Sequence, residues 1–223
     1  MPTKNKSMAY TSSAMSPAGS ESASAARLPQ LPLNPDPRRP STMISNMSNH
    51  LARQGETPAD GKAIRILGID PGLANTGWGI IEASQGKERA LAYGHITTQP
   101  DIKRYQRLLT IHDQITAVIK RYQPSEMAIE EVFFSTNARS ALTIGEVRGI
   151  AILAAAELGL SVEEYSATQI KQTVVGVGRA DKAQVQFMVK AILKLEQTPE
   201  PDHAADALAA ALCHARMRRM TTP

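Results

Sequence analysis

The sequence has only one cysteine, Cys213, among its 223 residues. One thiol excludes an internal disulfide framework, and it also excludes a zinc site built from several cysteines. Scarcity of cysteine is typical of proteins that work in a reducing compartment, which predicts a cytoplasmic location.

Long apolar runs and repeats are missing as well. No run approaches the ~20 apolar residues that a membrane-spanning helix needs, and the N-terminus lacks the apolar core of a secretory signal. The sequence therefore predicts neither a membrane protein nor a secreted one. No internal repeat is visible, which leaves a single folded domain as the simplest organisation.

A strong excess of one charge is also lacking. The formal net charge is +4, of which residues 1–62 carry +3 and the remaining residues only +1. Net charge alone therefore does not predict a nucleic-acid-binding protein, and any such function has to rest on local patches.

Residues 1–62 differ in composition from the rest of the chain. They are rich in Ser, Pro, Ala, Met and Asn and sustain no helical or strand period, so we expect a disordered extension. A later start at Met43 or Met47 would leave most of this extension out of the mature protein. The alternative is a basic arm that touches nucleic acid. We expect a folded domain over 63–217 and a short tail over 218–223.

Periodicity in the folded part predicts an α/β protein. Three strands separated by turns favour an antiparallel meander, and alternating helices and strands follow it. This order predicts a five-stranded mixed sheet flanked by helices on both faces. The expected strands are 64–70, 76–83, 91–97, 126–131 and 160–165, and the expected helices are 105–122, 137–158, 166–175, 181–195 and 202–216.

The first strand delivers a carboxylate to its C-terminal end. Apolar residues from Ile64 run into Asp70, and Pro71-Gly72 then ends the strand. An ionised carboxylate in such an apolar setting needs a cation or strong donors. The competing interpretation is a turn or cap aspartate.

Two later elements carry comparable acids. Glu130 and Glu131 end a buried-looking strand, and because successive side chains alternate they cannot both point at one site. In the final helix His203 and Asp206 share one face, while Asp202 lies near the N-cap position.

Converging Asp, Glu and His side chains are suited to Mg²⁺ or Mn²⁺. Such a site could hold one or two ions for phosphodiester hydrolysis. Each acid also has an ordinary structural explanation: Asp202 as a helix cap, Glu131 as a solvated acid, and His203 as an exposed histidine at a helix start.

A local basic strip lies between Ser166 and Leu195, where Asp181 is the one acid. Phosphate backbones bind such strips, although a solvated helix face is the usual explanation. Its cations are Lys171, Arg179, Lys182, Lys190 and Lys194.

Five motifs in order resemble the RuvC family of Holliday junction resolvases. Together they cover residues 64–216, essentially the whole folded part. The motifs are Gly68-Ile69-Asp70-Pro71-Gly72, Ala128-Ile129-Glu130-Glu131-Val132-Phe133, Asn137-Ala138-Arg139-Ser140-Ala141-Leu142, Lys171-Gln172-Thr173-Val174-Val175-Gly176-Val177-Gly178 and Asp202-His203-Ala204-Ala205-Asp206-Ala207-Leu208-Ala209.

The resemblance implies a ribonuclease H-like fold, a homodimer and Mg²⁺-dependent cutting of four-way DNA junctions. It implies an acidic site of Asp70, Glu130 and Asp206, with His203 at a fourth place where the all-carboxylate pattern has aspartate. An imidazole brings nitrogen rather than oxygen, which bears on the number of ions and on Mg²⁺ against Mn²⁺.

The same resemblance implies how DNA and protein partners bind. Phe133 is expected to work against the junction, and Lys171 and Lys182 are expected to contact the DNA backbone, with Arg179 beside them. The family's branch-migration proteins, RuvA and RuvB, are the expected partners. Three other functions stay open at this point: a ribonuclease H-like nuclease acting on RNA, a catalytically silent junction-binding protein, and an ATPase of the sugar-kinase type.

Overall fold

Five strands and five helices make up the part of the chain that the structure, a computed structural model, describes. That part is residues 63–131 and 138–221, so the extension predicted over 1–62 lies outside it. None of the described helices combines the length and apolar character that would let it span a membrane. The elements are β1 (Ile64–Asp70), β2 (Asn75–Ser84), β3 (Lys87–Thr97), α1 (Arg104–Tyr122), β4 (Glu126–Glu130), α2 (Ala138–Glu157), β5 (Ser161–Tyr165), α3 (Ala167–Val175), α4 (Lys182–Ile192) and α5 (Asp202–Thr221).

The strands form one mixed sheet in the order β3-β2-β1-β4-β5. The first three strands are antiparallel, while β4 and β5 run parallel to β1. The predicted five-stranded mixed sheet is thus confirmed. The third strand starts at Lys87, earlier than predicted, because Gln85 and Gly86 adopt positive φ angles of 45° and 81° and make a tight hairpin.

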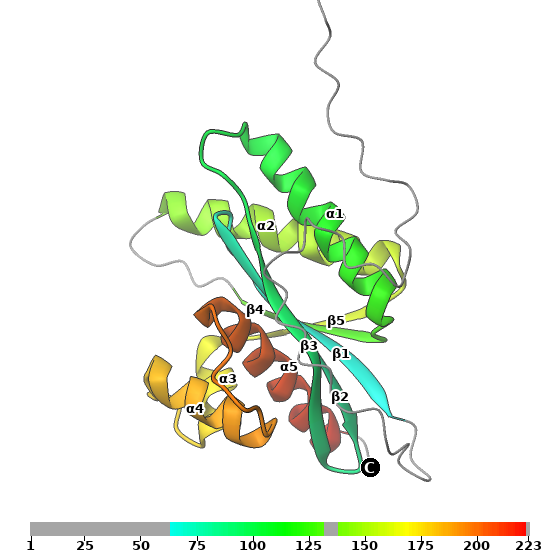
Figure 1. Cartoon of the computed structure of the whole chain (residues 1–223), viewed down its shortest axis with the longest axis vertical. Helices are drawn as coiled ribbons and strands as arrows, with labels where there is room; N and C mark the ends of the chain where they lie inside the picture. Colours follow the sequence, from blue (N-terminus) through cyan, green and yellow to red (C-terminus); the bar gives the residue numbers. More distant parts are fainter. Residues whose placement is uncertain (1–62, 132–137, 222–223) are drawn as a thin grey trace, which may run out of the picture. The chain divides into compact units, whose positions relative to one another are not determined.

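Helices cover both faces of the sheet, as predicted (Figure 1). Because side chains alternate along each strand, the sheet buries one set of residues under α1 and α2 and another under α3, α4 and α5. Leu67 and Ile69 of β1 face the first group of helices, whereas Ile66 faces the second. The odd and even positions of β1 therefore belong to different cores.

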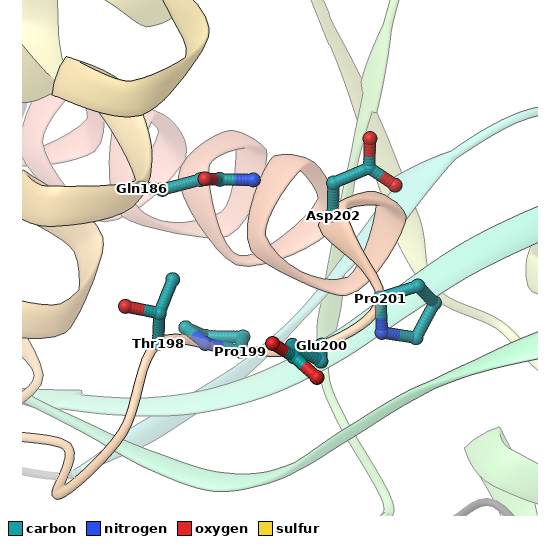
Figure 2. Close-up of a pocket in the computed structure, with 6 residues that line it drawn as sticks. All are labelled: Gln186, Thr198, Pro199, Glu200, Pro201 and Asp202. Carbon is teal, nitrogen blue, oxygen red and sulfur yellow. The ribbon is translucent and has the colours of Figure 1, made fainter.

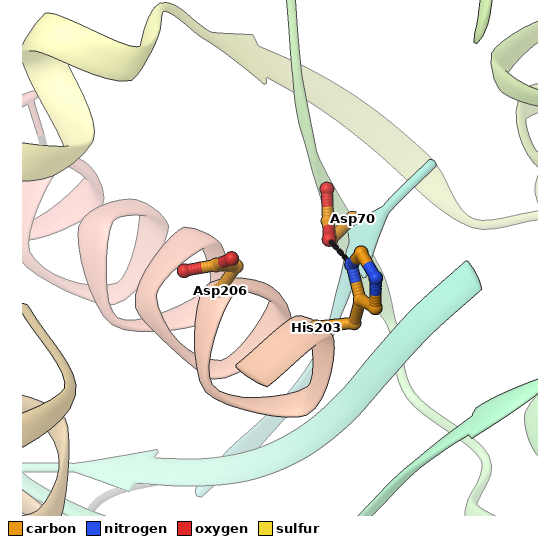
Figure 3. A group of neighbouring side chains, drawn as sticks. All are labelled: Asp70, His203 and Asp206. Atoms are coloured by element: carbon orange, nitrogen blue, oxygen red, sulfur yellow. Dashed lines mark hydrogen bonds and ion pairs between the residues drawn. The ribbon is translucent and has the colours of Figure 1, made fainter. Parts of the chain in front are cut away.

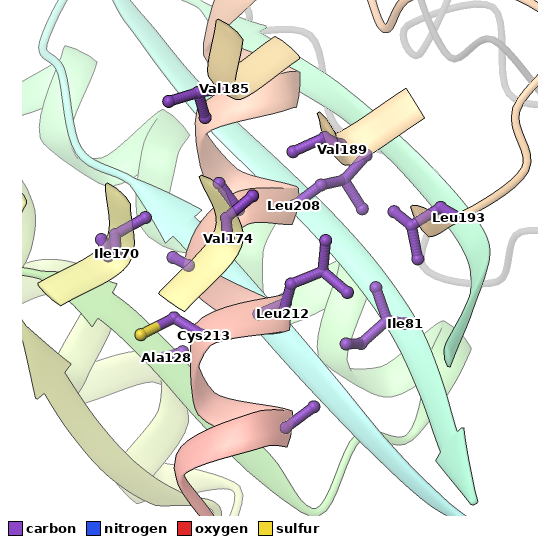
Figure 4. Close-up of a cluster of buried hydrophobic side chains, with 14 of the residues drawn as sticks. Ile81, Ala128, Ile170, Val174, Val185, Val189, Leu193, Leu208, Leu212 and Cys213 are labelled. Carbon is purple, nitrogen blue, oxygen red and sulfur yellow. The ribbon is translucent and has the colours of Figure 1, made fainter. Parts of the chain in front are cut away.

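Helix α5 packs directly on the sheet and is almost entirely buried in its middle (Figure 4). Its run of alanines allows a close approach, and two glycines of the sheet complete the fit. A Cβ on Gly68 would lie 1.9 Å from the carbonyl oxygen of Ala207, and one on Gly77 would lie 1.9 Å from that of His203. The backbone of α5 thus touches the backbone of β1 and β2.

Local sequence signals set the ends of the helices on this face. Ser166 and Asp181 form capping boxes at the starts of α3 and α4. Gly176 ends α3 in the left-handed conformation. Helix α5 was predicted to end at Arg216 but continues to Thr221, so most of the predicted tail over 218–223 is helical.

Candidate active site

Three side chains from distant parts of the chain meet at one edge of the sheet. Asp70 ends β1, and His203 and Asp206 lie in the first turns of α5 (Figure 3). Each offers a ligand atom within 4.8 Å of the others, which makes a group able to hold a metal ion. The predicted convergence of these three residues is therefore observed.

The fold explains why these side chains face one another. In β1, Gly68 and Asp70 lie on the face that carries α5, because Leu67 and Ile69 point into the opposite core. Gly68 and Gly77 let the start of α5 come down onto this face. His203 and Asp206, three residues apart, then point toward the end of β1. All three side chains are partly exposed, with accessible fractions of 20%, 34% and 26% for Asp70, His203 and Asp206.

Glu130 lies beside this group but outside the three-residue cluster. It ends β4, the parallel neighbour of β1, and shares the α5 face with Ala128. Burial, followed by the charges of Asp70 and Asp206, raises the pKa of Glu130 to about 7. Glu131 is exposed. Strand alternation therefore assigns Glu130 and not Glu131 to the site.

The raised pKa predicts that Glu130 destabilises the metal-free protein at high pH. Below pH ~4.5 the carboxyl is neutral in both states, but above pH 7 the folded state must hold a buried charge. In EDTA, Glu130→Gln is expected to raise the free energy of unfolding by about 2–3 kcal/mol at pH 8 and by less than about 1 kcal/mol at pH 5. Urea unfolding at the two pH values measures this. Glu131→Gln is the control, and equal gains for Glu130→Gln at both pH values would contradict the assignment.

His203 is hydrogen-bonded to Asp70. Its Nδ1 lies 2.7 Å from Oδ2 of Asp70, and since a carboxylate only accepts, Nδ1–H is the donor. This hydrogen bond raises the pKa of His203, against an opposing effect of burial. With Nδ1 occupied, Nε2 is the nitrogen left to bind a metal, an arrangement common among metal-binding histidines.

Lys182, at the first position of α4, reaches into the site. Its ammonium lies 2.6 Å from a carboxylate oxygen of Asp202 and 3.1 Å from one of Asp206. These two carboxylates raise the pKa of Lys182. Asp202 is therefore a partner of Lys182, and it also accepts a hydrogen bond from the backbone N–H of His203.

The other predicted DNA-binding residues lie at different distances from the site. Lys171, on α3, is near enough for its charge to oppose the rise in the pKa of Glu130. Arg179 is exposed in the connection between α3 and α4, and among the described residues it has no ion-pair partner. Phe133 lies outside the described residues.

Sequence reasoning missed His95, on β3. It pairs in register with Gly77, whose Cα packs against the carbonyl of His203. Burial lowers the pKa of His95, and the charge of His203 lowers it further. No motif marks His95, because only the pairing of β3 with β2 brings it close to the start of α5.

The loop after Asp70 is held by the end of β3 and by α1. The guanidinium of Arg107 donates to Oγ1 of Thr98 at 2.8 Å and to the carbonyl of Leu73 at 3.2 Å. The hydroxyl of Thr76 donates to the carbonyl of Gly72 at 2.7 Å. These bonds fix the turn that follows the aspartate.

A shallow pocket lies next to the cluster, at the start of α5 (Figure 2). Asp202 lines it, but Asp70, His203 and Asp206 do not. The cluster lies at the C-terminal end of β1, outside this pocket, and its three side chains are partly exposed to solvent. The lining residues are Gln186, Thr198, Pro199, Glu200, Pro201 and Asp202.

A mixed sheet in the order 3-2-1-4-5, with acids at the ends of the neighbouring strands β1 and β4 and on a helix packed over them, defines a ribonuclease H-like nuclease. The family model described as "Crossover junction endodeoxyribonuclease RuvC" matches residues 66–214. The chain belongs to the RuvC family.

Named relatives and a solved structure agree with this membership. The chain is 50% identical to the RuvC of Caldicellulosiruptor saccharolyticus over 152 residues, which is 68% of this chain and 92% of that protein. It is 52% identical to the RuvC of Moorella thermoacetica over 150 residues, which is 67% of this chain and 90% of that protein. The structure of T. thermophilus RuvC in complex with a Holliday junction substrate matches with a TM-score of 0.67 and 38% identity, covering 70% of this chain and 96% of that one.

Proposed function

We propose that this chain is a metal-dependent endonuclease that resolves four-way (Holliday) DNA junctions. It makes paired, symmetric cuts that leave 5′-phosphate and 3′-hydroxyl ends. The convergence of Asp70, His203 and Asp206 carries the proposal. It is supported by a relative of known structure that was solved with a Holliday junction substrate.

The donor set fits a divalent cation such as Mg²⁺ or Mn²⁺. Carboxylate oxygens suit both ions, whereas an imidazole nitrogen suits Mn²⁺ better than Mg²⁺. Asp70, Asp206, Glu130 and Nε2 of His203 would hold one or two ions. A bound ion supplies charge stabilisation at the scissile phosphate and lowers the pKa of water.

The chain's own side chains prepare the site for that ion. Asp70 orients the imidazole of His203 through the Nδ1 hydrogen bond. Glu130 has to lose its proton to act as a ligand, which its raised pKa delays until about pH 7. Lys182 neutralises Asp206 and competes with a metal for that carboxylate.

DNA is held by the basic groups around this site. Lys182, Lys171 and Arg179 are assigned to phosphates of the junction, since all three come from α3, α4 or the segment between them. Phe133 is assigned to an unpaired base at the crossover, where stacking is worth roughly 1–3 kcal/mol.

Paired cuts require two active sites, so the proposal includes a homodimer. Helices α1 and α2 expose large apolar side chains that a second copy would cover: Tyr105, Leu109, Leu142 and Leu153. RuvA and RuvB are proposed as partners on the family resemblance alone, and the reaction is assigned to the cytoplasm.

The test is cleavage of a synthetic four-way junction in Mg²⁺ and, separately, in Mn²⁺. Linear duplex and an RNA–DNA hybrid are the controls. We expect symmetric nicks in the junction only, with Mn²⁺ at least as effective as Mg²⁺ because His203 supplies a nitrogen. Junction binding without nicks in either metal would indicate a silent binding protein, and cleavage of the hybrid would indicate an RNA nuclease.

A further inference from the structure

A chain of hydrogen bonds, buried at its centre, joins α5 to β4 and β5. Oη of Tyr165 lies 2.7 Å from Nδ1 of His214, and Nε2 of His214 lies 2.7 Å from Oε2 of Glu126. The second oxygen of Glu126 accepts from Nε of Arg218 at 3.0 Å. His214 and Tyr165 are only 4% and 8% exposed, so their polar atoms depend on one another.

The directions of these bonds follow from the chemistry of the groups. Glu126 can only accept, so Nε2–H of His214 donates to it. The Nδ1 of a neutral His214 then accepts from the hydroxyl of Tyr165. Burial raises the pKa of Tyr165 to about 12, so this hydroxyl keeps its proton at neutral pH. In this arrangement the side-chain polar atoms of Tyr165, His214 and Glu126 all have hydrogen-bond partners.

This chain of hydrogen bonds connects β4 and α5, the elements that carry Glu130 and Asp206. Glu126 begins β4, the strand that ends at Glu130, and Tyr165 is the register partner of Glu130 in β5. His214 lies on α5, eight residues beyond Asp206, which is about 12 Å along the helix.

The position of Asp206 depends on such a connection more than the positions of Asp70 and Glu130 do. Those two are fixed by strand pairing, Asp70 opposite Gly77 of β2 and Glu130 opposite Tyr165 of β5. Asp206 belongs to α5, whose middle meets the sheet mainly through alanine and leucine. Apolar contacts of this kind have little directionality, whereas hydrogen bonds fix position and rotation.

We propose that Tyr165, His214 and Glu126 are positioning residues of the nuclease, which hold α5 in the register that places Asp206 beside Glu130 and Asp70. The proposal rests on the metal-dependent cleavage assigned above. Displacement of a reacting group by about 1 Å can cost on the order of 10²-fold in rate. Loss of one of these hydrogen bonds should therefore slow cleavage by more than the loss of folded protein explains.

The test compares three variants of the full chain. Tyr165→Phe keeps the ring and removes one hydrogen bond, His214→Leu breaks the chain, and His214→Gln can restore it with an amide in place of the imidazole. Ile115→Val, in the core on the other side of the sheet, is a control that loses stability away from α5. Circular dichroism verifies that each variant is folded at the assay temperature.

We expect Tyr165→Phe and His214→Leu to cut a four-way junction about tenfold more slowly at saturating Mn²⁺. We also expect weaker Mn²⁺ binding by titration calorimetry, unchanged junction affinity, and recovery in His214→Gln. Unchanged cleavage and Mn²⁺ binding in folded Tyr165→Phe would overturn the proposal, as would losses no larger than those of Ile115→Val. If the unaltered chain cuts no junction, the proposed function fails, and Mn²⁺ affinity still decides the positioning role.

Discussion

Asp70→Asn is expected to lose junction cleavage by on the order of 10³-fold or more while still binding the junction. Asp70 contributes a carboxylate to the cluster and also holds Nδ1 of His203. Asparagine keeps the shape but removes the charge that attracts a cation. A stabilisation of about 4 kcal/mol lost from the transition state corresponds to this factor.

Binding should survive because the proposal assigns the DNA phosphates to the surrounding cations and not to Asp70. Removing one negative charge also lessens repulsion of the phosphates, so the affinity is expected to stay equal or to rise slightly. Gel-shift titration in EDTA and single-turnover cleavage in Mg²⁺ measure the two effects separately. Glu131→Gln, beside the site but exposed, is the matched control and should cut normally. Loss of binding together with cutting, in a folded Asp70→Asn protein, would count against the assigned role.

Gly68→Ala is expected to destabilise the protein and to inactivate it, although glycine carries no functional group. The added Cβ would lie 1.9 Å from the carbonyl oxygen of Ala207 and 3.0 Å from the Cβ of Ala211. The first obstacle is backbone, so a side-chain rotation cannot relieve it and α5 has to move. Overpacking of this severity costs about 3 kcal/mol or more, which lowers the melting temperature by about 10 °C.

Movement of α5 also moves His203 and Asp206 away from Asp70, so cleavage should fall further than the loss of folded protein explains. Thermal unfolding and cleavage at a temperature where the variant is folded distinguish the two effects. Gly145→Ala on α2 is the control: its Cβ would meet no atom within 4 Å. Alanine is favoured there by up to about 1 kcal/mol in a helix. A fully active Gly68→Ala protein would show that the contact with α5 can relax.

Much of the site follows from local pattern. An apolar strand that ends in Asp70, strand alternation that separates Glu130 from Glu131, and the three-residue spacing of His203 and Asp206 are all visible in the sequence. The structure brings Asp70, His203 and Asp206 together as those patterns predict. The roles of these residues in catalysis, and those of the DNA-binding residues, stay predictions that the variants above test.

Contacts between residues far apart in the sequence were not predictable. Lys182 is predicted from the sequence to contact the DNA backbone. Its ion pairs with Asp202 and Asp206 depend on how α4 lies beside α5, which the sequence does not reveal. The last turns of α5 were missed because the apolar period fades there. Ion pairs of Arg218 with Glu126 and of Arg219 with Glu88 support these turns instead.

The dependence of the site on α5 has a consequence for the order in which the protein is made. Asp70 and Glu130 leave the ribosome early, but His203 and Asp206 belong to the last helix of the described chain. The same helix supplies eight of the 19 buried residues in the core cluster on its face of the sheet. A nascent chain therefore has neither a closed core on that face nor a complete set of acids until α5 has been synthesised. With the site proposed here, a chain that lacks α5 is expected to cut no DNA.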